Sequence, residues 1–172
     1  MHLASHASPY TQSTVSEETM FERFAHCARA AVDDASFEAG RCGDRRIGTE
    51  HLLIALLHDE ALARLVGVDA ATARYAADEL DRAALAAVGL ELGMFEPAAR
   101  TAVSRHISLT PGAKAALKQT LTNATDEKAR RLTSRHMLLA LLDRHEPDPA
   151  AVLLANLAVD PREARQRVAA CL

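Results

Sequence analysis

The residues from Gly43 to Glu50 offer the first chemistry to consider, because two glycines stand there at the spacing of a phosphate-binding loop. Such a loop needs a lysine directly after its second glycine and a β-strand before its first. Thr49 follows Gly48 instead, and no strand-like run precedes Gly43. The segment is therefore not a nucleotide site, and no other part of the sequence could serve as an ATPase.

Histidine and cysteine are the other residues with catalytic or metal-binding chemistry. His51 and His136 stand at equivalent places before two apolar runs, but no HExxH motif or Cys/His spacing accompanies them. Their duplication favours a structural hydrogen bond from each helix start to neighbouring backbone. Cys27 lies in an apolar helical pattern and is interpreted as a small core residue. We expect no catalytic residue, metal site or cofactor; the distant alternative, a helical Cys/His hydrolase, requires these side chains to converge in a cleft.

The elements that must position these residues are helices. Apolar residues make up 49% of the chain and aromatic ones only 3%, so alanine and leucine carry the packing and favour an all-α fold. The run Leu52–Leu57 is apolar on every face, which predicts a core helix surrounded by others. The helix N-caps are predicted at Thr49, Asp69, Thr110 and Asp160.

An internal duplication organises the chain. Residues 21–57 align without a gap on residues 106–142, at an offset of 85, and eleven of the 37 pairs are identical. Further on, Val68-Asp69 matches Val159-Asp160 at an offset of 91, which suggests that the first repeat is six residues shorter in its third helix. Two copies that cannot each bury an apolar face alone should pack as a pseudo-twofold pair.

The duplication and the turn signals predict four segments. The first is a flexible tail at residues 1–18, rich in Ser, Thr and His. A four-helix repeat follows at 19–88, then a linker at 89–108 and a second four-helix repeat at 109–172.

Charge and composition exclude several classes of protein. The formal net charge of −3 leaves no basic surface for nucleic acid, and no run approaches the roughly 18 apolar residues of a membrane span. The first twenty residues contain no Lys or Arg and no apolar run, so they are not a signal peptide. The three cysteines form no CxxC pair and are interpreted as reduced. We expect a cytoplasmic protein without nucleic-acid or membrane partners.

Three segments together form a recognisable pattern. They are Phe21–Phe24 (FERF), Ile47–Leu56 (IGTEHLLIAL) and Leu109–Lys114 (LTPGAK). On these segments the chain resembles the N-terminal Clp repeat domain of Clp ATPases, and most of all that of ClpC, over roughly residues 20–172. In that family the domain docks substrates and adaptor proteins ahead of an ATPase ring that unfolds them for a protease.

The resemblance implies two ligand sites. One is a phosphoarginine-like site in which Glu50 receives the guanidinium, while Thr49 and the helix N-terminus hold the phosphate. Its residues are Gly48, Thr49 and Glu50. The other is a groove that binds peptides and cyclic peptide antibiotics in the family, formed here by Phe21, Phe24, Leu109, Lys114 and Leu121.

The second repeat departs from the family pattern. Arg135 stands where the family has a glutamate, so a guanidinium would be repelled at that position. We therefore expect one phosphoarginine-like site at most, at Glu50. In the groove, Lys118 and Thr125 replace residues that are usually acidic and aliphatic, which changes the ligand preference.

The expected function is that of a non-catalytic protein- or peptide-binding module of the Clp proteolysis system, acting as an adaptor, a substrate receptor or a competitor of a Clp ATPase. Its partners would be Clp ATPase or protease components, adaptor or substrate proteins, and cyclic peptides. The alternative is a decoy that sequesters cyclic peptide antibiotics aimed at the ClpC N-terminal domain. A helical transcription regulator, disfavoured by the acidic balance, and a segment of a longer ATPase are further alternatives.

Overall fold

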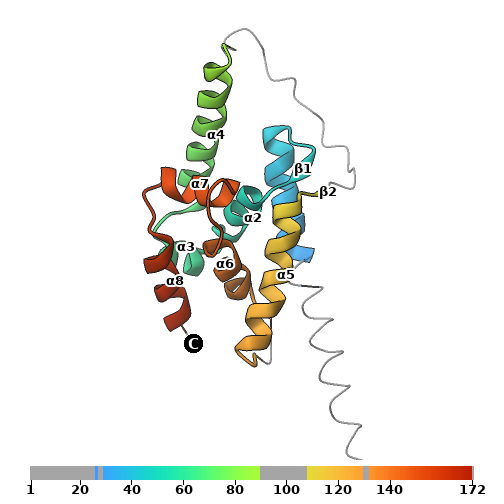
Figure 1. The fold of residues 1–172 in the computed structure, drawn as a ribbon, viewed down its shortest axis with the longest axis vertical. Helices are drawn as coiled ribbons and strands as arrows, with labels where there is room; N and C mark the ends of the chain where they lie inside the picture. The colour runs from blue at the N-terminus through green and yellow to red at the C-terminus, as the bar shows by residue number, and fades with distance from the viewer. Residues whose placement is uncertain (1–25, 27–28, 90–107, 130–131, 172) are drawn as a thin grey trace, which may run out of the picture.

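The computed structural model describes residues 26, 29–89, 108–129 and 132–171. The expected N-terminal tail and almost all of the expected linker lie outside them. The described residues form helices and one pair of two-residue strands, which confirms the all-α fold class (Figure 1). No helix among them is long and apolar enough to cross a membrane.

The same order of helices occurs twice along the chain. The first repeat begins with a helix at residues 29–42 and continues with β1 (Arg46–Ile47), α2 (Thr49–Leu56), α3 (Glu60–Val66) and α4 (Ala70–Ala87). The second consists of β2 (Ser108–Leu109), α5 (Pro111–Asp126), α6 (Ser134–Leu142), α7 (Pro149–Asn156) and α8 (Pro161–Ala170).

Helices α2 and α6 form the centre of the core, as their all-apolar sequences predict. Every residue of α2 except Glu50 is buried, and α6 is buried from His136 to its end. The other helices surround these two, and α4 extends away from the rest of the molecule (Figure 1). Because α2 and α6 are enclosed on all sides, neither repeat could bury its core helix without neighbours.

The two repeats pack against each other. Helix α3 of the first repeat packs against α8 of the second, and α7 of the second packs against α4 and α2 of the first. The strands β1 and β2 pair in parallel, with Arg46 beside Ser108 and Ile47 beside Leu109, and the Thr110 N–H donates to the Ile47 carbonyl at 2.9 Å. In these contacts the third and fourth helices of one repeat pack against the fourth and third helices of the other, as a pseudo-twofold pair requires.

Three of the four predicted N-caps are confirmed. The side chains of Asp69, Thr110 and Asp160 each accept a hydrogen bond from a backbone N–H in the first turn of α4, α5 and α8. The prediction for Thr49 is wrong, because Gly48 holds the extended cap conformation and Thr49 is the first helical residue. A threonine before an apolar run is the usual cap signal; here the Thr49 side chain has a different partner, described below.

The six-residue difference between the repeats does not lie in the third helix, as the sequence suggested. Helices α3 and α7 have seven and eight residues. Most of the difference precedes α7: its N-cap Asp148 stands 89 positions after Asp59, the N-cap of α3, although Leu57 and Leu142 are only 85 apart. The longer connection between α6 and α7 places Asp148 opposite the first repeat.

A buried carboxylate joins the first helix to α4. Glu38 is only 1% exposed, and its oxygens accept hydrogen bonds from Arg74 Nε at 2.8 Å and pair with His58 Nε2 at 2.9 Å. Although burial raises the pKa of a carboxyl group, the bonds to Arg74 and His58 outweigh it and lower the pKa of Glu38 from 4.5 to about 2. The charged form of Glu38 therefore stabilises the fold.

Replacing Glu38 by glutamine should lower the free energy of unfolding at pH 7 by about 1–3 kcal/mol, because two charge-assisted hydrogen bonds are weakened. Since the folded pKa lies below the unfolded one, this contribution is complete above about pH 4.5 and is lost as the pH falls towards 2. Urea denaturation at pH 7 and pH 3 measures both effects. Glu60→Gln, at an exposed carboxylate, is the control. If both variants lose the same unfolding free energy, the charged form of Glu38 does not stabilise the fold.

Candidate functional site

The N-terminus of α2 carries the three residues of the expected phosphoarginine-like site, and Thr49 is the most firmly held of them. Its side chain is 1% exposed. Its hydroxyl donates to Asp148 Oδ1 at 2.6 Å and accepts from the Ala150 N–H at 3.2 Å. Arg144 Nε donates to the other oxygen of Asp148 at 2.9 Å. The Thr49 hydroxyl is therefore committed to the junction with α7.

Glu50 folds back over its own helix start. A Cβ on Gly48 would overlap the Glu50 carboxylate, so a larger residue there would require the end of the Glu50 side chain to move. The carboxylate accepts its own backbone N–H, and its Oε2 is buried without a hydrogen-bond partner among the described residues. Burial raises the pKa of Glu50, and the nearby charges of Asp44 and Asp148 raise it further. The Glu50 carboxylate therefore lies against the start of its own helix.

The histidines play the structural part that their duplication predicted. His51 Nδ1 accepts from the Gly48 N–H at 3.0 Å, and His136 Nδ1 accepts from the Thr133 N–H at 3.0 Å. On the far side of each ring, Nε2 lies 3.3 Å from a carboxylate oxygen, of Asp44 in the first repeat and of Glu127 in the second. The same histidine contacts therefore stabilise the start of both core helices.

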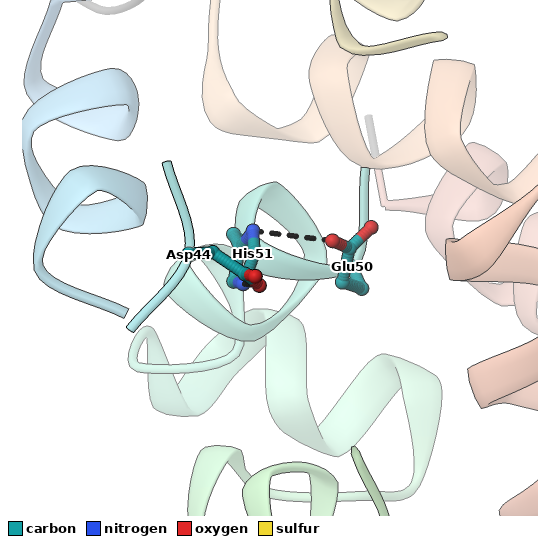
Figure 2. Close-up of side chains that lie close together, drawn as sticks. All are labelled: Asp44, Glu50 and His51. Atoms are coloured by element: carbon teal, nitrogen blue, oxygen red, sulfur yellow. Dashed lines mark ion pairs between the residues drawn. The ribbon is translucent and has the colours of Figure 1, made fainter. Parts of the chain in front are cut away.

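Asp44, Glu50 and His51 lie close enough to raise the question of a metal ion (Figure 2). The two carboxylates approach different ring nitrogens: Glu50 Oε1 is 3.2 Å from Nδ1, and Asp44 Oδ2 is 3.3 Å from Nε2. Because Nδ1 accepts the Gly48 N–H, the proton of the neutral ring is on Nε2. A metal at Nε2 would require the ring proton to move to Nδ1, and the hydrogen bond from the Gly48 N–H would then be lost. The arrangement fits a helix cap and does not fit a metal site.

The edge of the second repeat is occupied by Arg135. Its guanidinium donates to the Val168 carbonyl at 2.8 Å, to the Ala169 carbonyl at 3.3 Å and to Glu127 at 2.9 Å. The two carbonyls belong to the last turn of α8, where a cation is favourable. The arginine that departs from the family pattern therefore holds the C-terminal helix in place.

Comparisons with known proteins agree with this fold. A probable ATP-dependent Clp protease ATP-binding subunit of Chlamydia pneumoniae is 31% identical over 156 residues, which are 87% of this chain and 16% of that protein. The chloroplastic chaperone protein ClpC1 of Arabidopsis thaliana is 30% identical over 88% of this chain and 15% of its own length. The crystal structure of the N-terminal domain of ClpD from the same plant matches with a TM-score of 0.63 at 18% identity, covering 87% of this chain and 97% of that one.

The chain is a homologue of the Clp N-terminal domain. No protein-family model matches it. It spans only about a sixth of the length of the curated relatives that it matches.

The expected antibiotic groove of this Clp N-terminal domain is described only in part. Phe21 and Phe24 lie outside the described residues. Leu109 is half-buried in β2, and α5 carries Lys114, which is exposed, and Leu121, which is half-buried. Lys114 and Leu121 are seven positions apart and share one face of α5. The described part of the groove is thus an α5 face bordered by β2.

The described cysteines give no support to a Cys/His hydrolase. Cys27 lies outside the described residues, and Cys171 is exposed at the end of α8. Burial raises the pKa of the Cys42 thiol to about 11, and the neighbouring charges of Asp78 and Asp44 raise it further. A nucleophilic cysteine needs a lowered pKa. The raised pKa of Cys42 therefore argues against a nucleophilic role for this thiol.

Sequence reasoning missed Asp148 and Asp44 as parts of this edge. Asp148-Pro149 carries the same cap signal as Asp160-Pro161, so its place at the start of α7 was readable from the sequence. Its bond to Thr49 crosses 99 positions, and no local signal reports it. Asp44 stands in a loop of charged residues that gives no sign of which one will face His51.

Replacing Thr49 by valine should lower the free energy of unfolding by about 1–2 kcal/mol, because a buried side chain of the same shape loses both hydrogen bonds to the start of α7. Thr49→Ser keeps the hydroxyl and should retain most of the stability. Thermal and urea unfolding of the two variants measure the difference. If serine and valine destabilise equally, packing and not the hydroxyl holds the junction.

Replacing Arg135 by methionine should loosen α8 selectively, since the last carbonyls of that helix lose their donors. We expect a loss of about 1–2 kcal/mol in unfolding free energy and faster hydrogen exchange in α8, measured by mass spectrometry. Arg162→Met, on an exposed part of the same helix, is the control. Unchanged hydrogen exchange in α8 would show that Arg135 does not hold this helix in place.

Proposed function

We propose that this Clp N-terminal domain is a non-catalytic protein-binding module of the Clp proteolysis system. It acts as an adaptor, a substrate receptor or a competitor of a Clp ATPase in the cytoplasm, and its partners are Clp ATPase or protease components and the proteins they process. The relatives that it matches over about a sixth of their length, a probable ATP-binding subunit of a Clp protease and the chaperone ClpC1, support the assignment to that system.

The observation that carries the proposal is the state of Glu50 at the start of α2. Its carboxylate is partly buried, and Oε2 has no hydrogen-bond donor among the described residues. A buried carboxylate oxygen without a donor is costly, and a cationic group from a partner would relieve that cost. The docking edge that we propose comprises Gly48, Thr49 and Glu50, and in the family such an edge receives a phosphorylated arginine.

A degradation assay tests the proposal. The full chain is added to an assembled ClpC-type ATPase and its protease, and the rate of degradation of a model substrate is followed. We expect the chain to change that rate by at least about twofold, and Glu50→Gln to remove most of the change, because the loss of a charge-assisted contact weakens binding about tenfold. Glu60→Gln, the matched first-turn carboxylate of α3, should act like the unmodified chain.

Two other outcomes of the assay are informative. If the chain neither binds the ATPase, its substrates or its adaptors nor changes the rate of degradation, it does not act in this system. If it leaves degradation unchanged but relieves inhibition by a cyclic peptide antibiotic, it serves as a decoy. In that case, variants of the α5 face, such as Leu121→Asp, should abolish the protection, because that face forms part of the expected groove.

A further inference from the structure

A cleft in the first repeat lies at the place where the second repeat holds an arginine of its own. The cleft has a volume of about 470 Å³ and is formed by the first helix, α2, α3 and the start of α6. Its floor is apolar and includes Ala30, Leu56 and Leu62, and its rim includes Asp34 and Asp59. None of the described residues that line the cleft is an arginine or a lysine.

The duplication identifies the corresponding place in the second repeat. Asp59 of the cleft is the N-cap of α3, and Asp148 is the N-cap of α7, the matching helix. Ser134 of the cleft matches Thr49 at the offset of 85 between the repeats. The first helix matches α5 at the same offset. The counterpart of the cleft is therefore the space between α5, Thr49 and Asp148.

Arg144 occupies this space in the second repeat. Its Nε donates to Asp148 Oδ2 at 2.9 Å, and its Nη2 lies 3.9 Å from the position that a Cβ on Gly112 of α5 would take. The Cγ2 atom of Thr49 lies against the same position, at 3.6 Å. Arg144 belongs to the part of the α6–α7 connection that the shorter α2–α3 connection lacks. The first repeat therefore has the cleft without the arginine.

The charges at the cleft favour a cation. Asp34 and Asp59 are both exposed at its rim. His58 also lines the cleft, but its Nε2 pairs with Glu38 at 2.9 Å, and the Arg74 guanidinium beside it donates to the same carboxylate. Because Glu38 neutralises the nearest positive charge, the two aspartates leave the rim with a negative potential.

The shape and lining of the cleft suit an arginine side chain in particular. The methylene stem of an arginine packs on apolar surface while its charged head reaches polar groups at the edge. A planar guanidinium donates in several fixed directions, whereas an ammonium group is a compact point charge. The start of α7 shows that a capping aspartate more than offsets the positive end of a helix, because Arg144 is bound there.

We infer that the cleft of the first repeat binds an arginine side chain of a partner polypeptide, in the place that Arg144 fills in the second repeat. Asp59 receives the guanidinium, Asp34 adds negative charge at the rim, and the alanines and leucines of the floor hold the stem. The cleft shares no residue with the docking edge at residues 48–50, so this inference goes beyond the proposed function and is tested separately from it.

Isothermal titration calorimetry with the full chain tests the inference. The probes are three peptides with blocked ends, Ala-Leu-Xaa-Leu-Ala, in which Xaa is arginine, lysine or citrulline, the neutral isostere of arginine. We expect the arginine peptide to bind about tenfold tighter than the citrulline peptide, with the lysine peptide intermediate. Equal binding of the arginine and citrulline peptides, or no binding of any of them, would overturn the inference.

Two matched variants locate the site. Asp59→Asn keeps a good N-cap residue at α3 and should weaken binding of the arginine peptide about tenfold, because the carboxylate is lost. Asp69→Asn makes the same change at the N-cap of α4, outside the cleft, and should leave binding unchanged. Thermal unfolding shows that both variants are folded. If the two variants bind the arginine peptide equally well, Asp59 does not receive the guanidinium and the inference is wrong.

A chain that fills its own cleft gives a second test. The sequence Arg-His-Glu-Pro of residues 144–147 is inserted between His58 and Asp59, so that the first connection takes the length of the second. We expect the inserted arginine to occupy the cleft and to weaken binding of the arginine peptide about tenfold. The control insertion has alanine in place of that arginine and should bind the peptide like the unmodified chain. Equal binding by the two insertions would contradict the assigned occupant.

Discussion

Two short apolar helices, α2 and α6, form the centre of the core; α2 is buried except at Glu50, and α6 is buried from His136 to its end. Buried backbone N–H groups must find partners within the protein. In both repeats a histidine in the first turn accepts the N–H of the cap residue and turns its other nitrogen towards a carboxylate. The rest of the edge follows from this requirement, since the residues near each helix start are recruited to cap it or to join it to the other repeat.

The asymmetry between the repeats lies in charged residues around a common core. At the position of Glu38 the second repeat has Asn123, and the arginine that matches Arg74 pairs instead with Asp143. Glu50 is matched by Arg135, which holds α8. Core positions tolerate little change because volume and polarity are both constrained. Charged positions at the margin could change role in one copy while the helices stayed in place.

Periodicity, composition and the gap-free duplication were sufficient to predict the helices, their order and the buried core, because those features depend on local pattern. The cap at Thr49 was misplaced by one residue, since its hydroxyl is drawn to Asp148 by a contact across 99 positions. The buried ion pair of Glu38 could have been predicted in part, because a carboxylate three residues after Ala35, on the buried face of its helix, requires a cationic partner. Which arginine supplies it depends on tertiary packing, and sequence alone could not tell.

The chemistry of the α2 edge also depends on tertiary packing, so its motif alone could not predict it. Gly48-Thr49-Glu50 has the residue types of an anion-binding helix start, and the motif alone predicts that its donors are free. In the folded chain the Thr49 hydroxyl donates to Asp148 of the other repeat, the Gly48 N–H donates to His51, and the Glu50 carboxylate lies over the helix start. A helix N-terminus attracts any nearby negative charge, and a carboxylate of the same chain is always close to it, whereas a ligand must bind from solution. Ligand preference at such an edge therefore depends on competition with internal carboxylates, and one of them, Asp148, is placed there only by the packing of the two repeats.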